Sequence, residues 1–347
     1  MAVLNSNLQT WFAKVTLTAG LMGLVTGLYG DISLTVPFLD NNRSIAQVPP
    51  VPQTPISNNF CGGIGGDIRV ASVQIPSPDG MLAAKIYAPD ESLQTAPCPL
   101  ISMLPGGGAG IESVEWAATR LAANGYVVII TKPINGTSTL SYNTAVKSGI
   151  DFMLSAANPF VASTHDTAIG AAGWSLGGRT LTRTQREDLR IQAIVAWDNL
   201  AVRESGDDGS PVCTFTGSNY ETPRVPAMGQ ASETCSGSED LKKTAFNWWR
   251  QNGVPSFVAV FSGWNHFGWG QKASNSAYDL SHYFTIAWFD RWLKNDLAAT
   301  NRLLAPTPNY STSSGMPKLS TVLSTKYNSA AFLDGYDCHS LQESCSK

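Results

Sequence analysis

Residues 167–188 contain a short apolar strand pattern that runs into a helix pattern with only a tight turn between them. TAIGAAG (167–173) leads to Ser175, and LGGRTLTRTQRED (176–188) then has a helical pattern. Residues 173–178 read GWSLGG and match the G-x-S-x-G turn, which exposes a serine between a strand and a helix. The glycines keep side chains from colliding where strand and helix nearly touch. This context predicts that Ser175 is a nucleophile rather than part of an ordinary turn.

Strand and helix patterns alternate on both sides of this turn. A Pro- and Gly-containing turn separates two alternating stretches at the start, which predicts a β-hairpin. The remaining patterns repeat as β-α units, so we predict an α/β fold with a mostly parallel sheet and helices on both faces. The predicted strands are 68–75, 81–88, 99–104, 126–131, 167–173, 191–197, 225–231 and 256–261, and the predicted helices are 112–125, 141–157, 176–188, 239–253 and 277–296.

The N-terminal region differs in composition from the rest. Residues 15–30 carry no charge, are short for a membrane span and are typical of an export signal, with a small-x-small cleavage pattern at Ser44–Ala46. We therefore expect a secreted or extracytoplasmic protein; a retained anchor and a buried apolar helix are the alternatives. The predicted segments are an export signal or signal anchor (1–46), a Pro- and Gly-rich spacer (47–64), an α/β catalytic domain (65–297) and a C-terminal tail with a disulfide (298–347).

The cysteine pattern agrees with export. There are six cysteines, an even number without a C-x-x-C pair, which argues for disulfides and against a structural metal site. Six buried thiols in a reducing compartment are the alternative. The sequence leaves many pairings open, and proximity along the chain favours Cys338–Cys345 and Cys213–Cys235, which leaves Cys61–Cys98.

Charge and motifs exclude several other functions. The net charge of −3 provides no basic face for nucleic acid. No phosphate loop, metal-binding cluster or nucleotide fingerprint is present in the sequence, so we expect no cofactor and no metal. Membrane contact is expected only through the N-terminal segment.

One of the four histidines follows a late apolar strand, as the base for a serine nucleophile does in such folds. His266 lies in the loop GWNHFG (263–268), directly after the strand at 256–261. We predict that it is the base. The other three, His165, His282 and His339, are interpreted as surface or packing residues.

The GWSLGG turn and the later strand IVAW (194–197) resemble the α/β-hydrolase superfamily over about residues 65–297. They are similar to the branch that contains cutinase-like polyester hydrolases, dienelactone-hydrolase-like proteins and platelet-activating-factor acetylhydrolases. The resemblance implies a secreted serine hydrolase that cleaves small or polymeric carboxylic esters through an acyl-enzyme. A non-catalytic binding protein on the same scaffold and a serine peptidase or acyltransferase with the same triad are the alternatives.

The resemblance also implies an oxyanion hole made of two backbone amides. In this branch, the loop after the third strand donates one N–H and the residue after the nucleophile donates the other. PGGG at 105–108 occupies that loop, with Pro105 in place of the usual histidine. By position the donors are Gly107 and Leu176; a merely flexible turn is the alternative for the glycines.

The position of the catalytic acid departs from that of the polyester-hydrolase relatives. Their aspartate follows the strand that here is VPAMGQA (225–231), but this strand leads to Glu233 with no aspartate before Asp240. The preceding strand ends directly at Asp198, where the platelet-activating-factor acetylhydrolases place their acid. We predict Asp198 as the acid, with Glu233 as the alternative.

Three tryptophans adjoin the predicted catalytic residues in sequence: Trp174, Trp197 and Trp264. If they line a cleft, the substrate has an apolar or aromatic part. Core packing is the alternative for each of them.

Overall fold

The computed structural model divides the chain into two units, Met1–Ala46 and Gln47–Lys347. The predicted export signal, most of the spacer, Glu233, and the predicted Cys213–Cys235 pair lie outside the described residues, so these predictions stay open. All described residues belong to the second unit and are 61, 67–93, 96–198, 200–201, 221–232, 239–262, 264–270, 276–306, 308–311, 317–319, 329–338, 340–341 and 345.

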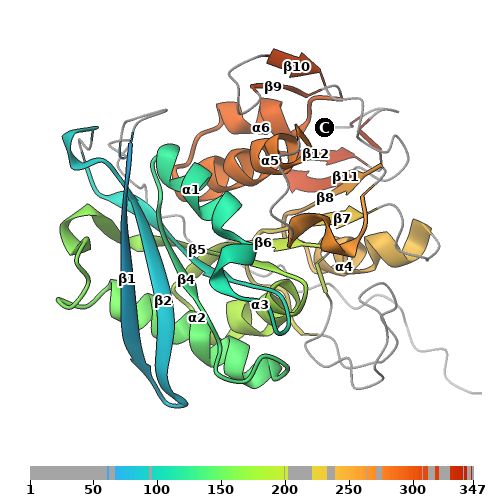
Figure 1. Ribbon diagram of the computed structural model, residues 1–347. Helices are drawn as coiled ribbons and strands as arrows, with labels where there is room; N and C mark the ends of the chain where they lie inside the picture. The colour runs from blue at the N-terminus through green and yellow to red at the C-terminus, as the bar shows by residue number, and fades with distance from the viewer. Residues whose placement is uncertain are drawn as a thin grey trace, which may run out of the picture. The chain divides into compact units, whose positions relative to one another are not determined.

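The second unit is built on a ten-stranded sheet (Figure 1). Its strands are β1 (Ile68–Ser77), β2 (Gly80–Pro89), β3 (Cys98–Leu104), β4 (Val127–Thr131), β5 (Thr164–Trp174), β6 (Ile191–Trp197), β7 (Ala227–Ser232), β8 (Ser256–Phe261), β11 (Ser329–Leu333) and β12 (Tyr336–Cys338). Their order is β1-β2-β4-β3-β5-β6-β7-β8-β11-β12. Strands β3 to β8 pair parallel with one another. The predicted hairpin of β1 and β2 is antiparallel, and β2 also pairs antiparallel with β4. The carboxyl ends of the parallel strands therefore meet at one edge.

Helices cover both faces of the sheet, as the repeated β-α pattern predicts. They are α1 (Glu115–Ala123), α2 (Thr139–Met153), α3 (Leu176–Glu187), α4 (Glu239–Gln251), α5 (Ser276–Leu293) and α6 (Ala298–Leu303). Buried side chains of α1, α5 and α6 share one apolar cluster with the sheet, and those of α2, α3 and α4 share another. Neighbouring strand residues alternate between the clusters: Ala172 belongs to the first and Ala171 to the second. The α/β prediction is confirmed.

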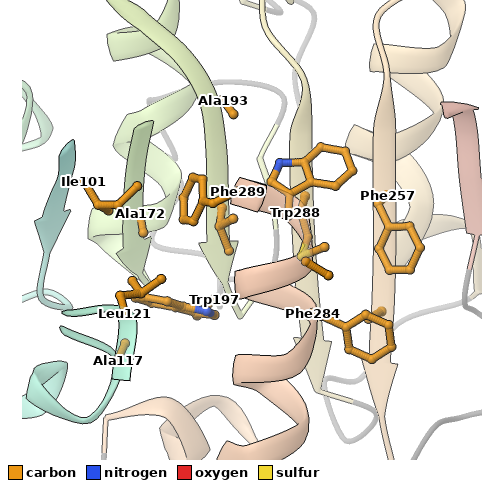
Figure 2. Packing of buried hydrophobic residues seen from close by; sticks show 14 of the residues in the cluster. Ile101, Ala117, Leu121, Ala172, Ala193, Trp197, Phe257, Phe284, Trp288 and Phe289 are labelled. Carbon is orange, nitrogen blue, oxygen red and sulfur yellow. The ribbon is translucent and has the colours of Figure 1, made fainter. Parts of the chain in front are cut away.

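Small residues on the strands make room for large aromatic residues on α5. Figure 2 shows Trp288 and Phe289 in the first cluster together with Ala172 and Ala193. A Cβ built on Gly170 of β5 would lie 2.7 Å from Phe289 Cε1, closer than packed atoms approach. The glycine in this strand is thus required by close packing of α5 rather than by backbone conformation.

Part of the C-terminal region, predicted as a tail, pairs with the main sheet. Strand β11 pairs antiparallel with β8, with Ser329 opposite Val258, and β12 continues the sheet beyond it. Leu333 and Cys338 are buried in the first cluster. A second, two-stranded sheet consists of β9 (Asn309–Ser311) and β10 (Pro317–Leu319). Such short strands form by pairing with an existing edge, which a local pattern does not reveal.

Two of the three predicted disulfides are formed among the described cysteines. Cys61 is bonded to Cys98 at the start of β3, and Cys338 at the end of β12 is bonded to Cys345. Both closed loops restrict the unfolded chain and thereby stabilise the fold. Disulfides are typical of proteins in oxidising compartments.

No helix among the described residues is long and apolar enough to cross a membrane.

The end of α3 is tied to α2 by a carboxylate with three hydrogen-bond donors. Glu187 accepts hydrogen bonds from Lys147 Nζ at 2.5 Å, from Asn143 Nδ2 at 2.8 Å and from Arg183 Nε at 2.5 Å. Burial by itself raises the pKa of this carboxyl, but the three donors outweigh it and lower the pKa from 4.5 to about 2. The ionised form is therefore favoured by folding.

This lowered pKa predicts an acid-dependent loss of stability. The carboxylate stabilises the fold above pH 4.5, the ordinary pKa of the group, and this contribution is lost as the pH falls toward 2, the pKa in the folded state. We expect Glu187→Gln to lower the free energy of unfolding by about 2 kcal/mol at neutral pH. Urea unfolding at pH 7, 5 and 3 should show the two proteins converging in acid. Glu91→Gln, at an exposed ion pair, is the control, and a difference that persisted undiminished at low pH would contradict the assignment.

Candidate active site

Ser175 lies in a strained turn between β5 and α3. Its backbone has φ 56° and ψ −119°, a region that residues other than glycine rarely adopt. A Cβ built on Gly173 would lie 2.5 Å from the carbonyl carbon of Gly177, and one on Gly177 would lie 2.5 Å from Pro105 O. Both glycines of the motif are therefore required by close contact. The turn has the predicted strand-serine-helix geometry.

His266 contacts Ser175 from the loop after β8. Its Nε2 lies 3.0 Å from Ser175 Oγ, and its side chain is 26% exposed. The short 3-10 turn that begins at this histidine is held at both ends: Trp174 Nε1 donates to the His266 carbonyl at 3.0 Å, and Trp116 Nε1 of α1 donates to the Trp269 carbonyl at 2.8 Å. The imidazole is thus positioned by backbone contacts as well as by its own hydrogen bonds.

Asp198 follows β6 directly and lies on the other side of the imidazole. Its Oδ2 is hydrogen-bonded to His266 Nδ1. Its Oδ1 accepts hydrogen bonds from Ser232 Oγ at 3.0 Å and from Ser232 N at 3.3 Å. The residue is 1% exposed and has φ 59°, which aspartate tolerates better than most residues. The three predicted residues are therefore brought together in the order serine, histidine, aspartate.

Gly107 and Leu176, the predicted oxyanion donors, lie side by side. A Cβ built on Gly107 would be 3.5 Å from Leu176 Cδ2. The Leu176 amide begins α3 and so has no intrahelical acceptor. The Gly107 amide makes no backbone–backbone hydrogen bond to any other described residue. Neither N–H group therefore has a backbone acceptor among the described residues.

Trp197 corrects one sequence prediction. Of the two readings, substrate contact and core packing, the structure supports packing: Trp197 has no exposed surface and lies in the first apolar cluster with Leu121, as Figure 2 shows. Its Nε1 donates to Thr285 Oγ1 of α5 at 3.2 Å. The side chain points to the sheet face covered by α1 and α5, so it stabilises the core instead of lining a substrate site.

The other two tryptophans lie around the histidine loop. Trp174 is 7% exposed and fits against Gly106 and Gly270, where a Cβ would lie 2.5 Å and 2.1 Å from its ring atoms. Trp264 is partly exposed, and its ring centroid lies 4.7 Å from that of Trp269. Trp174 thus has mainly a positioning role in this structure, and Trp264 keeps surface that a substrate could touch.

Sequence reasoning missed two residues of the site. Phe267 is 59% exposed, and its ring centroid lies 5.2 Å from that of His266. Ser232 supports Asp198 from the end of β7. Its position was predictable in principle, because the neighbouring parallel strands β6 and β7 end at the same edge. Nothing in the sequence distinguishes it from other serines at strand ends.

A sheet of this order, with helices on both faces and a strained serine turn after β5, defines an α/β-hydrolase. More specifically, the chain matches the PET hydrolase-like family over residues 52–318 and belongs to that family. Lipase 1 of Moraxella sp. (strain TA144) is 25% identical over 251 residues, which are 71% of this chain and 71% of that lipase. These relationships place the protein among ester hydrolases at the level of the family.

Proposed function

We propose that the protein is a secreted serine hydrolase that cleaves carboxylic esters through an acyl-enzyme intermediate. The observation that carries this proposal is the hydrogen-bonded chain from Ser175 through His266 to Asp198. A serine hydroxyl is a weak nucleophile until a neighbouring base accepts its proton, and the 3.0 Å contact with His266 Nε2 supplies that base. Family membership supports an ester as the substrate.

The proposed reaction follows from this geometry. Ser175 Oγ attacks the ester carbonyl carbon while its proton passes to His266 Nε2, and the resulting oxyanion is stabilised by the amides of Gly107 and Leu176. The imidazolium then protonates the leaving alcohol, which leaves the acyl group on the serine. Water then attacks the acyl-enzyme by the same series of proton transfers, and the carboxylic acid product is released. Asp198 keeps the proton on Nδ1 and stabilises the positive imidazolium.

The surroundings of the histidine favour an apolar or aromatic substrate. Phe267 and Trp264 keep exposed aromatic surface beside His266, and such rings bind acyl or aryl groups of esters. The substrate can be a small molecule or a polymer, and we propose no nucleic-acid partner and no membrane contact beyond the N-terminal segment. The two disulfides and the apolar N-terminal stretch support an exported protein.

A substrate panel tests the proposal against its alternatives. p-Nitrophenyl esters from acetate to palmitate and a polyester film should be hydrolysed, while a matched peptide p-nitroanilide and acyl transfer to an added alcohol should be much slower. Absence of turnover on every ester would favour a binding protein on the same scaffold. Faster cleavage of the anilide would favour a peptidase.

Phe267 offers a test of the substrate class. We expect Phe267→Ala to raise KM about tenfold for long-chain and aryl esters and to leave KM for the acetate nearly unchanged, because only the larger groups reach the ring. Leu189→Ala is a matched control: this residue is 74% exposed and precedes β6, at the opposite edge of the sheet. Equal changes in KM for acetate and palmitate would contradict a role for Phe267 in selecting apolar groups.

A further inference from the structure

A buried tyrosine connects α2 to the glycine loop that contains Gly107. Tyr142 has no exposed surface, and its hydroxyl donates to the Gly106 carbonyl at 2.6 Å. The same hydroxyl lies 3.4 Å from the carbonyl of Gly136, in the loop between β4 and α2. The phenol thus sits between the two loops that follow β3 and β4.

The phenol is suited to act as a donor. Burial raises the pKa of Tyr142 to about 12, and a hydrogen bond with the Gly108 backbone opposes this shift only in part. The hydroxyl therefore keeps its proton throughout the neutral range, and the short contact with Gly106 O is a donated hydrogen bond.

The glycine loop needs restraints from outside. Three consecutive glycines, Gly106 to Gly108, have little intrinsic preference for one backbone conformation. Within the loop, Ala109 N donates to Gly106 O at 3.0 Å, and Gly108, with φ 69°, donates to Gly136 O at 2.8 Å. Tyr142 adds the contact that ties the loop to a helix.

The direction of one peptide plane links this contact to the site. The carbonyl of Gly106 and the N–H of Gly107 belong to the same planar trans peptide and point in opposite directions. The described residues contain no cis peptide bond. A donor that holds the carbonyl on one side therefore holds the N–H on the other. A rotated peptide would present an oxygen, instead of a donor, on that side.

We propose that Tyr142 is a positioning residue for the oxyanion hole. By binding the Gly106 carbonyl, it keeps the Gly107 N–H directed at the oxygen that becomes negative during ester cleavage. This inference rests on the proposed function, because it assigns Tyr142 to the same reaction. Tyr142 need not touch the substrate in this role, so loss of its hydroxyl should lower kcat and leave KM nearly unchanged.

Tyr142→Phe tests the inference. We expect kcat for an oxygen ester to fall about tenfold, less than the loss of a whole oxyanion donor, with little change in KM. The specific readout is the ratio of kcat/KM for an ester to that for the matching thionoester. Sulfur accepts hydrogen bonds poorly, so a well-oriented hole favours the oxygen ester, and the variant should show a smaller ratio. Tyr126→Phe, which removes another buried phenol bonded to Asp290 at 2.6 Å, should leave the ratio unchanged.

A second variant keeps the test decisive if Tyr142→Phe does not fold. 4-Aminophenylalanine at position 142 retains the ring and a weaker donor, so its ratio should lie between those of the wild-type and a protein without the donor. An unchanged ratio in whichever variant folds would overturn the inference while leaving the ester hydrolase intact. Absence of ester turnover in the wild-type protein would instead refute the proposed function.

Discussion

Replacing Ser175 by alanine is expected to lower kcat for ester hydrolysis by about 100,000-fold. The hydroxyl is the only group in the proposed reaction that forms a bond to substrate, so its removal eliminates the acyl-enzyme route. The fold should persist, because Ser175 contributes one side-chain hydrogen bond, to His266, and its backbone bonds to Trp197 and Arg179 are kept. Initial rates with p-nitrophenyl butyrate and the thermal unfolding midpoint together measure both effects.

A buried serine elsewhere in the sheet provides the control for this substitution. Ser102 of β3 has no exposed surface and donates to the Val146 carbonyl at 3.2 Å, on the α2 side of the sheet. Ser102→Ala should lower stability by about 1 kcal/mol and leave kcat within a few-fold of wild type. If Ser175→Ala kept more than a few per cent of wild-type kcat, Ser175 would not be the nucleophile.

Asp198→Asn is expected to lower kcat by about 10,000-fold. The amide has nearly the shape of the carboxylate, and Ser232 still donates to its oxygen. The NH₂ group then faces His266 Nδ1 and forces the proton onto Nε2, so the imidazole cannot accept the proton of Ser175. The stabilisation of the imidazolium is lost as well.

Glu233→Gln is the matched comparison, since it also exchanges one carboxylate for an amide. We expect it to change kcat by less than about threefold. Steady-state kinetics of both variants on one ester, with circular dichroism to establish folding, rank the two carboxylates. The reverse ranking would assign the acid to Glu233 and make Asp198 a residue of the turn.

Local sequence patterns were sufficient to predict the parts of the site whose geometry is set by residues close together in the chain. The turn at Ser175 is encoded by glycines two residues away on either side, and parallel β-α units place the ends of β6 and β8 at its edge. The prediction of Asp198 and His266 used the position of each directly after a strand, together with the resemblance to other α/β-hydrolases. No comparable local signal distinguishes Asp198 from Glu233, and the structure brings Asp198 to the histidine.

Features that depend on packing between distant segments could not be predicted. Trp197 ends a strand beside the site. Which face of the sheet its side chain occupies depends on packing with α1 and α5, and each of these helices is about 80 residues away along the chain. Tyr142 contacts a carbonyl 36 residues earlier, with no pattern in the sequence that links the two. Strands β11 and β12 form only because β8 offers an open edge.

The central claim is that Ser175 is an activated nucleophile, and covalent labelling tests it most directly. The protein is incubated with a fluorophosphonate, and intact mass and peptide mapping then identify the modified residue. We expect one adduct per chain, on the peptide that contains Ser175, with ester hydrolysis lost in parallel and no adduct in Ser175→Ala. An unlabelled protein that hydrolyses esters, or labelling of another residue with Ser175 unmodified, would contradict it.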